Sequence, residues 1–204
     1  MARDFKIGFD LDGVAFPTPQ LIVAYWNNVF GRNYGTIDLP ALMPHEMYGV
    51  SAEDLQRELL VFFHSQGFRD MPPLDGAVEG LRRLSEFGCT SYAITTKPAG
   101  VEQATLESVR RHFGDLFAEV LFSNTSGLGV AGRETKPQIA HRIGAKVLVD
   151  DYLPSLNGCF ESGVTGLLFD HNLDYGWCKR QIPEGLGVVR NWNELVDKIE
   201  AIAD

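Results

Sequence analysis

The sequence predicts an α/β fold in which a parallel sheet is covered by helices on both faces, and three observations support this. From about Pro72 onward, short apolar runs alternate with amphipathic stretches. The apolar runs are continuous, as expected for strands buried on both faces, and their alternation with helices is typical of parallel sheets. Glycine closes each of four amphipathic stretches, where a left-handed residue commonly ends a helix; these are Gly88, Gly114, Gly144 and Gly163.

The elements follow in order along the chain. The predicted strands are FKIGF (5–9), TSYAIT (90–95), EVLFS (119–123), KVLVD (146–150) and TGLLF (165–169). The amphipathic stretches between them cover 77–88, 100–114, 136–144 and 153–163. A last helix is expected over 191–204, with Asn191 as N-cap and Glu194 completing a capping box.

The segment between the first strand and Pro72 has a different character. It shows no strand pattern, and helical patterns cover 19–31 and 51–67. Such a segment is too long for an ordinary connection between a strand and a helix and too apolar for a linker. We therefore expect a core made of residues 1–17 and 71–204, with residues 18–70 forming a helical cap over the end of the first strand.

The amino-acid composition and net charge limit the kinds of molecule that the protein is expected to bind. The chain has 204 residues, a formal charge of −9 and 45% hydrophobic residues, enough for a sizeable core. An acidic chain favours neither a nucleic-acid polymer nor an anionic membrane surface as partner. The three cysteines have no metal-ligand or disulfide-framework spacing, and no apolar run approaches the roughly 18 residues of a membrane span. We expect a cytoplasmic protein with a small ligand; a homodimer is compatible with these data.

Oxygen ligands stand at the exits of three predicted strands. The first strand leads to Asp10 and Asp12, the second ends in Thr95 and Thr96, and the fourth leads to Asp150 and Asp151. In an open parallel sheet, ligands bind at the carboxyl ends of the strands. Closely spaced carboxylates repel unless a cation relieves the repulsion. Carboxylates and hydroxyls together predict a Mg²⁺ site that also receives a phosphate group.

The order of these segments resembles the haloacid dehalogenase superfamily of phosphohydrolases. The resemblance rests on DLDGV at 10–14, on Thr95 at a strand end, on Lys136 in ETKPQIA, and on the acidic pair in VLVDD. It covers nearly the whole chain and implies a Rossmann-like, three-layer core. It also implies a Mg²⁺-dependent phosphatase that forms an aspartyl-phosphate.

The resemblance assigns a role to each acid. Asp10 would be the nucleophile and a metal ligand. Asp12 would be the general acid and then the general base, and its main-chain carbonyl would bind the metal. Of the acidic pair, Asp151 is favoured as the direct Mg²⁺ ligand and Asp150 as a co-ligand or a supporting residue, although the sequence does not decide between them.

Two further residues would hold the phosphoryl oxygens, Thr95 and Lys136. Thr96 or Ser123 could replace Thr95 in this role, because each also ends a predicted strand. A Lys-Pro pair is also an ordinary way to begin a helix, which is the structural alternative for Lys136.

The leaving group is expected to meet the cap. The segment SQGFRDMPPLDGAVEGLRRLSEFG, together with YAITTKP, resembles the helical-cap 5′(3′)-deoxyribonucleotidases, although AFPTPQ after Val14 departs from their pattern. This resemblance implies a 5′-nucleotidase. Phe68, which stands outside the helical pattern and beside the expected hinge at residues 70–74, is the expected ligand contact in the cap. The alternatives are a phosphatase of another small metabolite, such as a sugar phosphate, and a non-catalytic protein that binds a phosphorylated ligand.

Overall fold

A computed structural model describes residues 4–40, 44–98, 100–123, 133–179 and 182–204. The described residues contain one six-stranded parallel sheet with strand order β3-β2-β1-β4-β5-β6. The strands are β1 (Phe5–Phe9), β2 (Cys89–Thr96), β3 (Val120–Ser123), β4 (Ala145–Asp150), β5 (Thr165–Phe169) and β6 (Gly187–Val189). The predicted α/β class is confirmed, and the first five strands were predicted to within a residue or two. The short edge strand β6 was not predicted.

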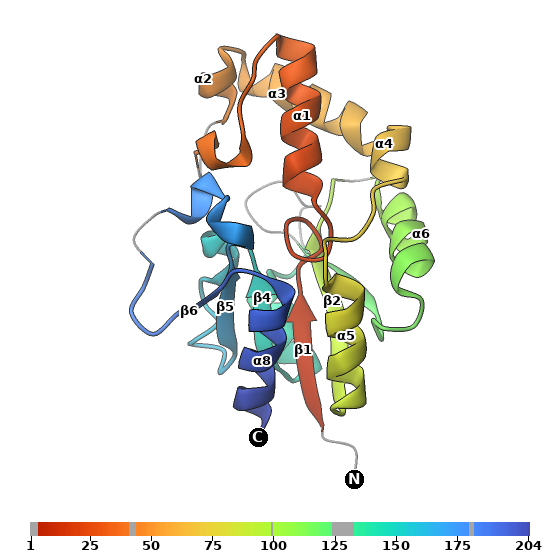
Figure 1. Cartoon of the computed structure of the whole chain (residues 1–204), viewed down its shortest axis with the longest axis vertical. Helices are drawn as coiled ribbons and strands as arrows, with labels where there is room; N and C mark the ends of the chain where they lie inside the picture. The colour runs from red at the N-terminus through yellow and green to blue at the C-terminus, as the bar shows by residue number, and fades with distance from the viewer. Residues whose placement is uncertain (1–3, 41–43, 99, 124–132, 180–181) are drawn as a thin grey trace.

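Helices cover both faces of the sheet (Figure 1). On one face, α5 (Ala77–Glu86) packs beside α8 (Trp192–Ala203), and α6 (Glu102–Phe113) extends this layer. On the other face, α7 (Lys136–Ile143) packs against β4, β2 and β1. Alternate residues of β4 supply the two cores: Val147 and Val149 belong to the first, and Leu148 to the second. The three-layer arrangement brings the carboxyl ends of β2, β1 and β4 side by side.

One predicted helix is wrong in extent. Residues 153–163 form only a 3₁₀ helix, η2 (Leu153–Leu156), followed by turns. Gly158 adopts a positive φ of 89°, so a left-handed residue interrupts this stretch before it can complete a regular helix. The expected N-cap of the last helix is confirmed, because Asn191 Oδ1 accepts the N–H of Glu194. Glu194 in turn accepts the N–H of Arg190, one residue before the N-cap.

The segment between β1 and α5, for which we keep the name cap (residues 18–70), consists of helices joined by turns and loops in its described parts, without a strand. It contains α1 (Thr18–Phe30), η1 (Thr36–Asp38), α2 (Pro44–Tyr48), α3 (Ala52–Phe63) and α4 (Gln66–Arg69). These helices lie above the carboxyl end of β1 (Figure 1). The domain boundaries at 17/18 and 70/71 remain a prediction.

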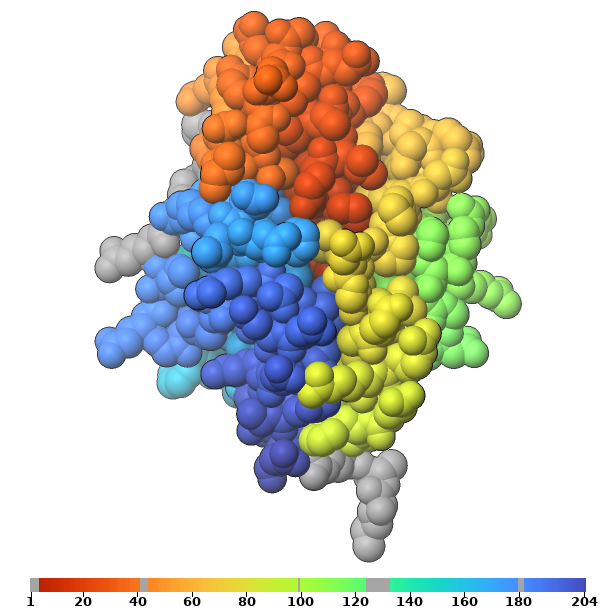
Figure 2. Space-filling view, in the orientation of Figure 1, coloured from red at the N-terminus to blue at the C-terminus, as the bar shows by residue number. Residues whose placement is uncertain are grey.

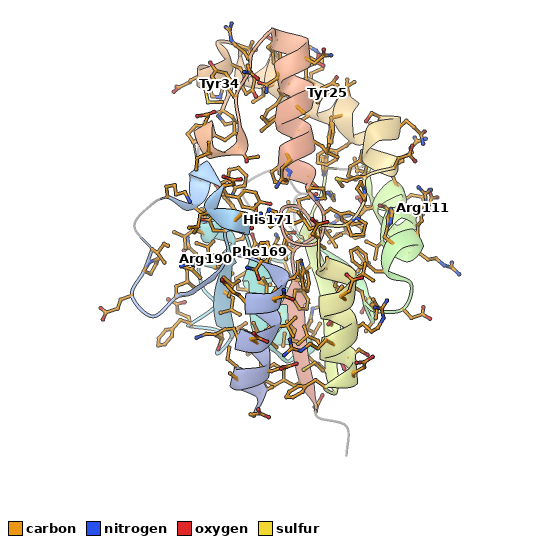
Figure 3. The ribbon with its side chains drawn as sticks, viewed as in Figure 1. Tyr25, Tyr34, Arg111, Phe169, His171 and Arg190 are labelled. Atoms are coloured by element: carbon orange, nitrogen blue, oxygen red, sulfur yellow. The ribbon has the colours of Figure 1, made fainter. Side chains whose placement is uncertain are left out.

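The cap lies directly on the core, including the segment that follows β5 (Figure 2). A Cβ at Gly176, in η4 (Gly176–Cys178), would overlap the main-chain oxygens of Ile37 and Leu39 in the cap. At the other side, Arg111 of α6 donates to the Arg69 carbonyl oxygen at 2.9 Å, below α4 (Figure 3). The cap therefore covers the strand ends at which the predicted site residues stand.

No helix in the described parts of the chain has the length and apolar character that crossing a membrane requires.

Candidate active site

The carboxyl ends of β1 and β4 bring three buried carboxylates together. Asp10 follows β1, Asp150 ends β4, and Asp151 comes next. One oxygen from each lies within 4.8 Å of the others, and all three side chains are buried. These strands are neighbours in the sheet, which places residues 140 positions apart in the sequence against one another. The predicted convergence of these acids is what the structure shows.

A tight loop after β1 turns the chain past this cluster. The carbonyl oxygen of Leu11 accepts the N–H groups of Ala15 and Phe16, at 3.0 and 2.8 Å. Gly13 has a φ of 77°, a left-handed conformation that favours glycine. A Cβ at Gly13 would overlap the carboxylate of Asp151, so the loop and the β4 exit are in direct contact.

Lys136 is the cation at the centre of the cluster. It begins α7, and its ammonium lies 2.9 Å from Asp10 and 2.5 Å from Asp150. Burial lowers the pKa of Lys136, but the two carboxylates outweigh burial and raise it above its ordinary value. Burial raises the pKa of Asp10 to about 7, against the lowering effect of Lys136. Lys136 does begin a helix, as the structural alternative expected, but its ammonium also forms ion pairs with Asp10 and Asp150.

The two acids of the β4 exit have different surroundings. Asp150 accepts a hydrogen bond from Lys136 through one oxygen and from the N–H of Tyr152, at 2.9 Å, through the other. Asp151 faces like charges instead. Its burial, followed by repulsion from Asp150 and Asp10, raises its pKa well above its ordinary value.

This donor set fits a divalent cation. Carboxylate oxygens are the ligands that Mg²⁺ prefers, and a bound cation removes the repulsion that raises the pKa of Asp151. Asp10 and Asp151 are the carboxylates best placed to contact an ion, because both oxygens of Asp150 already accept hydrogen bonds, from Lys136 and Tyr152, whereas Lys136 contacts one oxygen of Asp10. These surroundings favour the predicted direct role of Asp151.

The two threonines that end β2 also differ. Thr95 is fully buried, and its hydroxyl has no hydrogen-bond partner among the described residues. The hydroxyl of Thr96 pairs with that of Ser123 at 2.7 Å. Buried hydroxyls are normally satisfied, and an exception at a strand exit is a candidate ligand contact. Of the three predicted phosphate-binding hydroxyls, Thr95 is therefore the one that is free to bind.

Asp12 has a partner that the sequence did not predict. Both of its carboxylate oxygens accept from the Lys97 ammonium, at 2.5 and 2.6 Å. Lys97 comes directly after β2, and its side chain is 1% exposed. A signal was present, because a cation follows the two threonines at a strand exit. Only the parallel pairing of β1 with β2 reveals that it meets Asp12.

Phe68, the expected ligand contact, lies in the hydrophobic core with 2% of its surface exposed. Its ring packs against Phe62 and Phe63 and lies 5.1 Å from the Lys97 ammonium. Phe68 and Asp12 thus contact the same ammonium group, that of Lys97. Contact with a substrate remains a prediction for this residue.

Two further residues that the sequence did not predict, Tyr175 and Trp177, form hydrogen bonds to the main chain of the site. The Tyr175 hydroxyl donates to the Gly13 carbonyl oxygen at 2.9 Å and accepts from Gln20 of α1 at 3.3 Å. Its ring stacks on Trp177, whose indole N–H donates to the Asp151 carbonyl oxygen at 3.0 Å. These two aromatic residues hold the main chain of both acidic segments.

The chain matches no protein-family model and no curated protein significantly. Solved structures do match, over nearly the full length of both chains.

One is a protein from Lactobacillus delbrueckii subsp. bulgaricus named as an inferred phosphoglycolate phosphatase, with a TM-score of 0.66, 15% identity, and coverage of 98% of this chain and 99% of that one. A Thermotoga maritima protein named as an inferred β-phosphoglucomutase has a TM-score of 0.59 and 17% identity, with coverage of 97% and 99%. A haloacid dehalogenase-like hydrolase from Streptococcus pneumoniae has a TM-score of 0.63 and 16% identity, also with coverage of 97% and 99%. The chain has the fold of the haloacid dehalogenase-like hydrolases.

Proposed function

We propose that the protein is a Mg²⁺-dependent phosphomonoesterase that acts on a small phosphorylated metabolite through an aspartyl-phosphate. The observation that carries the proposal is the cluster of Asp10, Lys136 and Asp151 at adjacent strand ends, with Asp12 on the loop that follows Asp10. This cluster supports the proposal because the residues predicted as nucleophile, phosphate-binding cation and metal-binding carboxylate lie close to one another.

The first step uses Asp10 and Asp12. One oxygen of Asp10 attacks phosphorus and forms a bond to it, while the bond to the ester oxygen breaks. The departing oxygen takes a proton from one oxygen of Asp12, so the Lys97 ammonium would contact only the other oxygen when this step begins. Lys136 and the hydroxyl of Thr95 hold the phosphoryl oxygens while the charge moves.

The second step returns the protein to its starting state. Asp12, now a carboxylate, removes a proton from water as the water oxygen attacks phosphorus. The bond from phosphorus to Asp10 breaks, and inorganic phosphate leaves. Asp10 and Asp151 would hold Mg²⁺, which would supply positive charge that offsets the negative charge on the phosphoryl group.

The cap favours a small leaving group over a nucleoside. Base stacking needs an accessible aromatic face, but Phe62, Phe63 and Phe68 pack on one another, and Trp26 packs on Tyr48. All five side chains are buried. Two of the similar structures are named for a small phosphorylated acid and a phosphorylated sugar. These observations support the metabolite phosphatase more than the predicted 5′-nucleotidase, for which no comparison gives support.

The test is phosphate release from a panel that contains p-nitrophenyl phosphate, 2-phosphoglycolate, sugar phosphates, and ribo- and deoxyribonucleoside 5′-monophosphates. Each substrate is assayed with Mg²⁺, with EDTA, and with Asp10→Asn. Asp115→Asn, which changes an exposed acid, is the matched control. We expect Mg²⁺-dependent release from a small metabolite that Asp10→Asn abolishes and Asp115→Asn leaves intact. Release from nucleotides alone, varying with the base, would restore the nucleotidase, and no release from any substrate would contradict an enzymatic function.

A further inference from the structure

Lys97 connects the cap to the acid/base residue of the site. Its ammonium lies 2.5 and 2.6 Å from the two oxygens of Asp12, so a single cation contacts the whole carboxylate. Contact with both oxygens restricts rotation of the carboxylate about its last bond. The lysine side chain is 1% exposed, whereas that of Asp12 is 23% exposed. Buried lysines are almost always paired, and here the pairing partner is a predicted catalytic group.

The opposite side of the ammonium faces the cap. The Phe63 ring of α3 lies 4.7 Å from the Lys97 nitrogen, and the Phe68 ring of α4 lies 5.1 Å from it. The two rings meet edge to face, with centroids 5.1 Å apart. Both distances are within the range at which a cation is attracted by an aromatic face. Lys97 is therefore held between two cap rings and one core carboxylate.

No substrate group fits between Lys97 and the cap as they lie. The cavity beside them has a volume of about 10 Å³, room for a single water molecule. Its walls include Asp12, Phe68 and Ser108, and the hydroxyl of Ser108 has no partner among the described residues. The phosphate-binding lysine is a different residue, since Lys136 contacts Asp10 and Asp150. Lys97 is thus placed to act through Asp12 rather than by contact with the substrate.

On the basis of the proposed function, we infer that Lys97 is a positioning residue through which the seating of the cap fixes the orientation of Asp12. With the cap seated, the two rings leave room for about one water molecule beside the ammonium, and Asp12 is its charged partner. When the cap moves away, bulk water reaches the ammonium, and the long lysine side chain is free to leave Asp12. The acid/base residue is correctly held only while the cap covers the site.

The test is a double-mutant cycle on Lys97 and Phe68, with p-nitrophenyl phosphate and Mg²⁺. Lys97→Met is expected to lower kcat about tenfold or more while KM changes less than about twofold, and Lys97→Arg is expected to recover part of the loss. Phe68→Leu is expected to lower kcat several-fold when Lys97 is present and to have no further effect beside Lys97→Met. Phe62→Leu, which packs on Phe68 without facing Lys97, is the control and should cost the same factor in both backgrounds.

Two results would overturn the inference. One is an equal loss from Phe68→Leu in both backgrounds, which indicates a purely structural role for the ring. The other is a rise in KM without a fall in kcat for Lys97→Met, which indicates a substrate contact. If Phe68→Leu does not fold, Phe63→Leu replaces it in the same cycle.

Amide hydrogen exchange at residues 11–16, the loop that carries Asp12, compares the effect of Phe68→Leu with and without Lys97 and requires no substrate. Phe68→Leu should accelerate exchange there only when Lys97 is present, and acceleration in both backgrounds would contradict the inference. A wild-type protein that hydrolyses no substrate would disprove the proposed function, while this exchange measurement would still decide the role of Lys97.

Discussion

Gly13 and the carboxylate of Asp151 are in such close contact that a Cβ at residue 13 would overlap the carboxylate. Gly13→Ala is therefore expected to displace Asp151 and to weaken Mg²⁺ binding and turnover by about tenfold or more. Gly144→Ala is the matched control, because Gly144 has a similar φ, 75° against 77°, and open space around it. Both variants should lose about 1 kcal/mol of stability from the left-handed backbone. Equal activity in the two variants, measured beside Mg²⁺ titrations, would contradict a role for this contact.

Substitution of Thr95 is expected to affect the stability and the activity of the protein in different ways. Thr95→Val keeps the shape of the side chain and removes the unsatisfied hydroxyl, so urea unfolding should show an unchanged or higher stability, by up to about 1 kcal/mol. Phosphate release should fall, because the hydroxyl is expected to hold a phosphoryl oxygen. Thr95→Ser should keep most of the activity. A loss of stability in Thr95→Val, with activity intact, would show that the hydroxyl serves the fold.

Lys136 neutralises buried charge, so its removal should destabilise the protein. Lys136→Met leaves Asp10 and Asp150 without their cation, and breaking a buried pair in this way costs about 3–5 kcal/mol at neutral pH. The loss should shrink at lower pH, because the two acids can then take up protons. Lys146→Met, at an exposed position of β4, should have little effect. Chemical denaturation at pH 5 and pH 7.5 measures both, and a loss that does not depend on pH would contradict the charge argument.

The raised pKa of Asp10 makes Mg²⁺ binding depend on pH. Burial raises this pKa to about 7, far above its unfolded value, so the metal-free fold holds a proton that the unfolded chain releases between about pH 4 and 7. This group therefore stabilises the metal-free protein at low pH, and the contribution disappears as pH rises through 7. Mg²⁺ at the proposed site would require the carboxylate and would displace the proton. Calorimetric titrations should show weaker Mg²⁺ binding at pH 6 than at pH 8, with proton release at the lower pH. Affinity that is constant over this range would contradict a metal contact by Asp10.

Much of the site was predictable because its residues stand at strand exits. Continuous apolar runs predicted β1 and β4, and a parallel sheet necessarily brings their carboxyl ends to one edge. The acids of both exits were expected to converge on that ground, and the structure places Asp10, Asp150 and Asp151 together. Their separate roles came from the resemblance to the haloacid dehalogenase superfamily. The sequence favoured Thr95 as the phosphate-binding hydroxyl and left Thr96 and Ser123 as alternatives. Only the hydrogen bond between Thr96 and Ser123 distinguishes them, and that contact depends on the spacing of β2 and β3.

The contacts that the sequence did not predict depend on packing between segments that are distant in the chain. Lys97 meets Asp12 across 85 residues, and its second contact comes from the cap. Phe68 was assigned to the ligand because it stands outside the helical pattern of the cap. It forms part of a short helix, α4, and its ring lies 5.1 Å from the Lys97 ammonium. Tyr175 reaches Gly13 from a loop after β5 that has no periodic pattern in the sequence.

The most direct test of the account is acid quenching during turnover of a ³²P-labelled substrate, followed by mapping of the labelled peptide. The mechanism predicts that the label is bound covalently to the peptide containing Asp10, and that Asp10→Asn neither carries label nor releases phosphate. Phosphate release by the wild type without any protein-bound label, together with activity in Asp10→Asn, would contradict the aspartyl-phosphate mechanism.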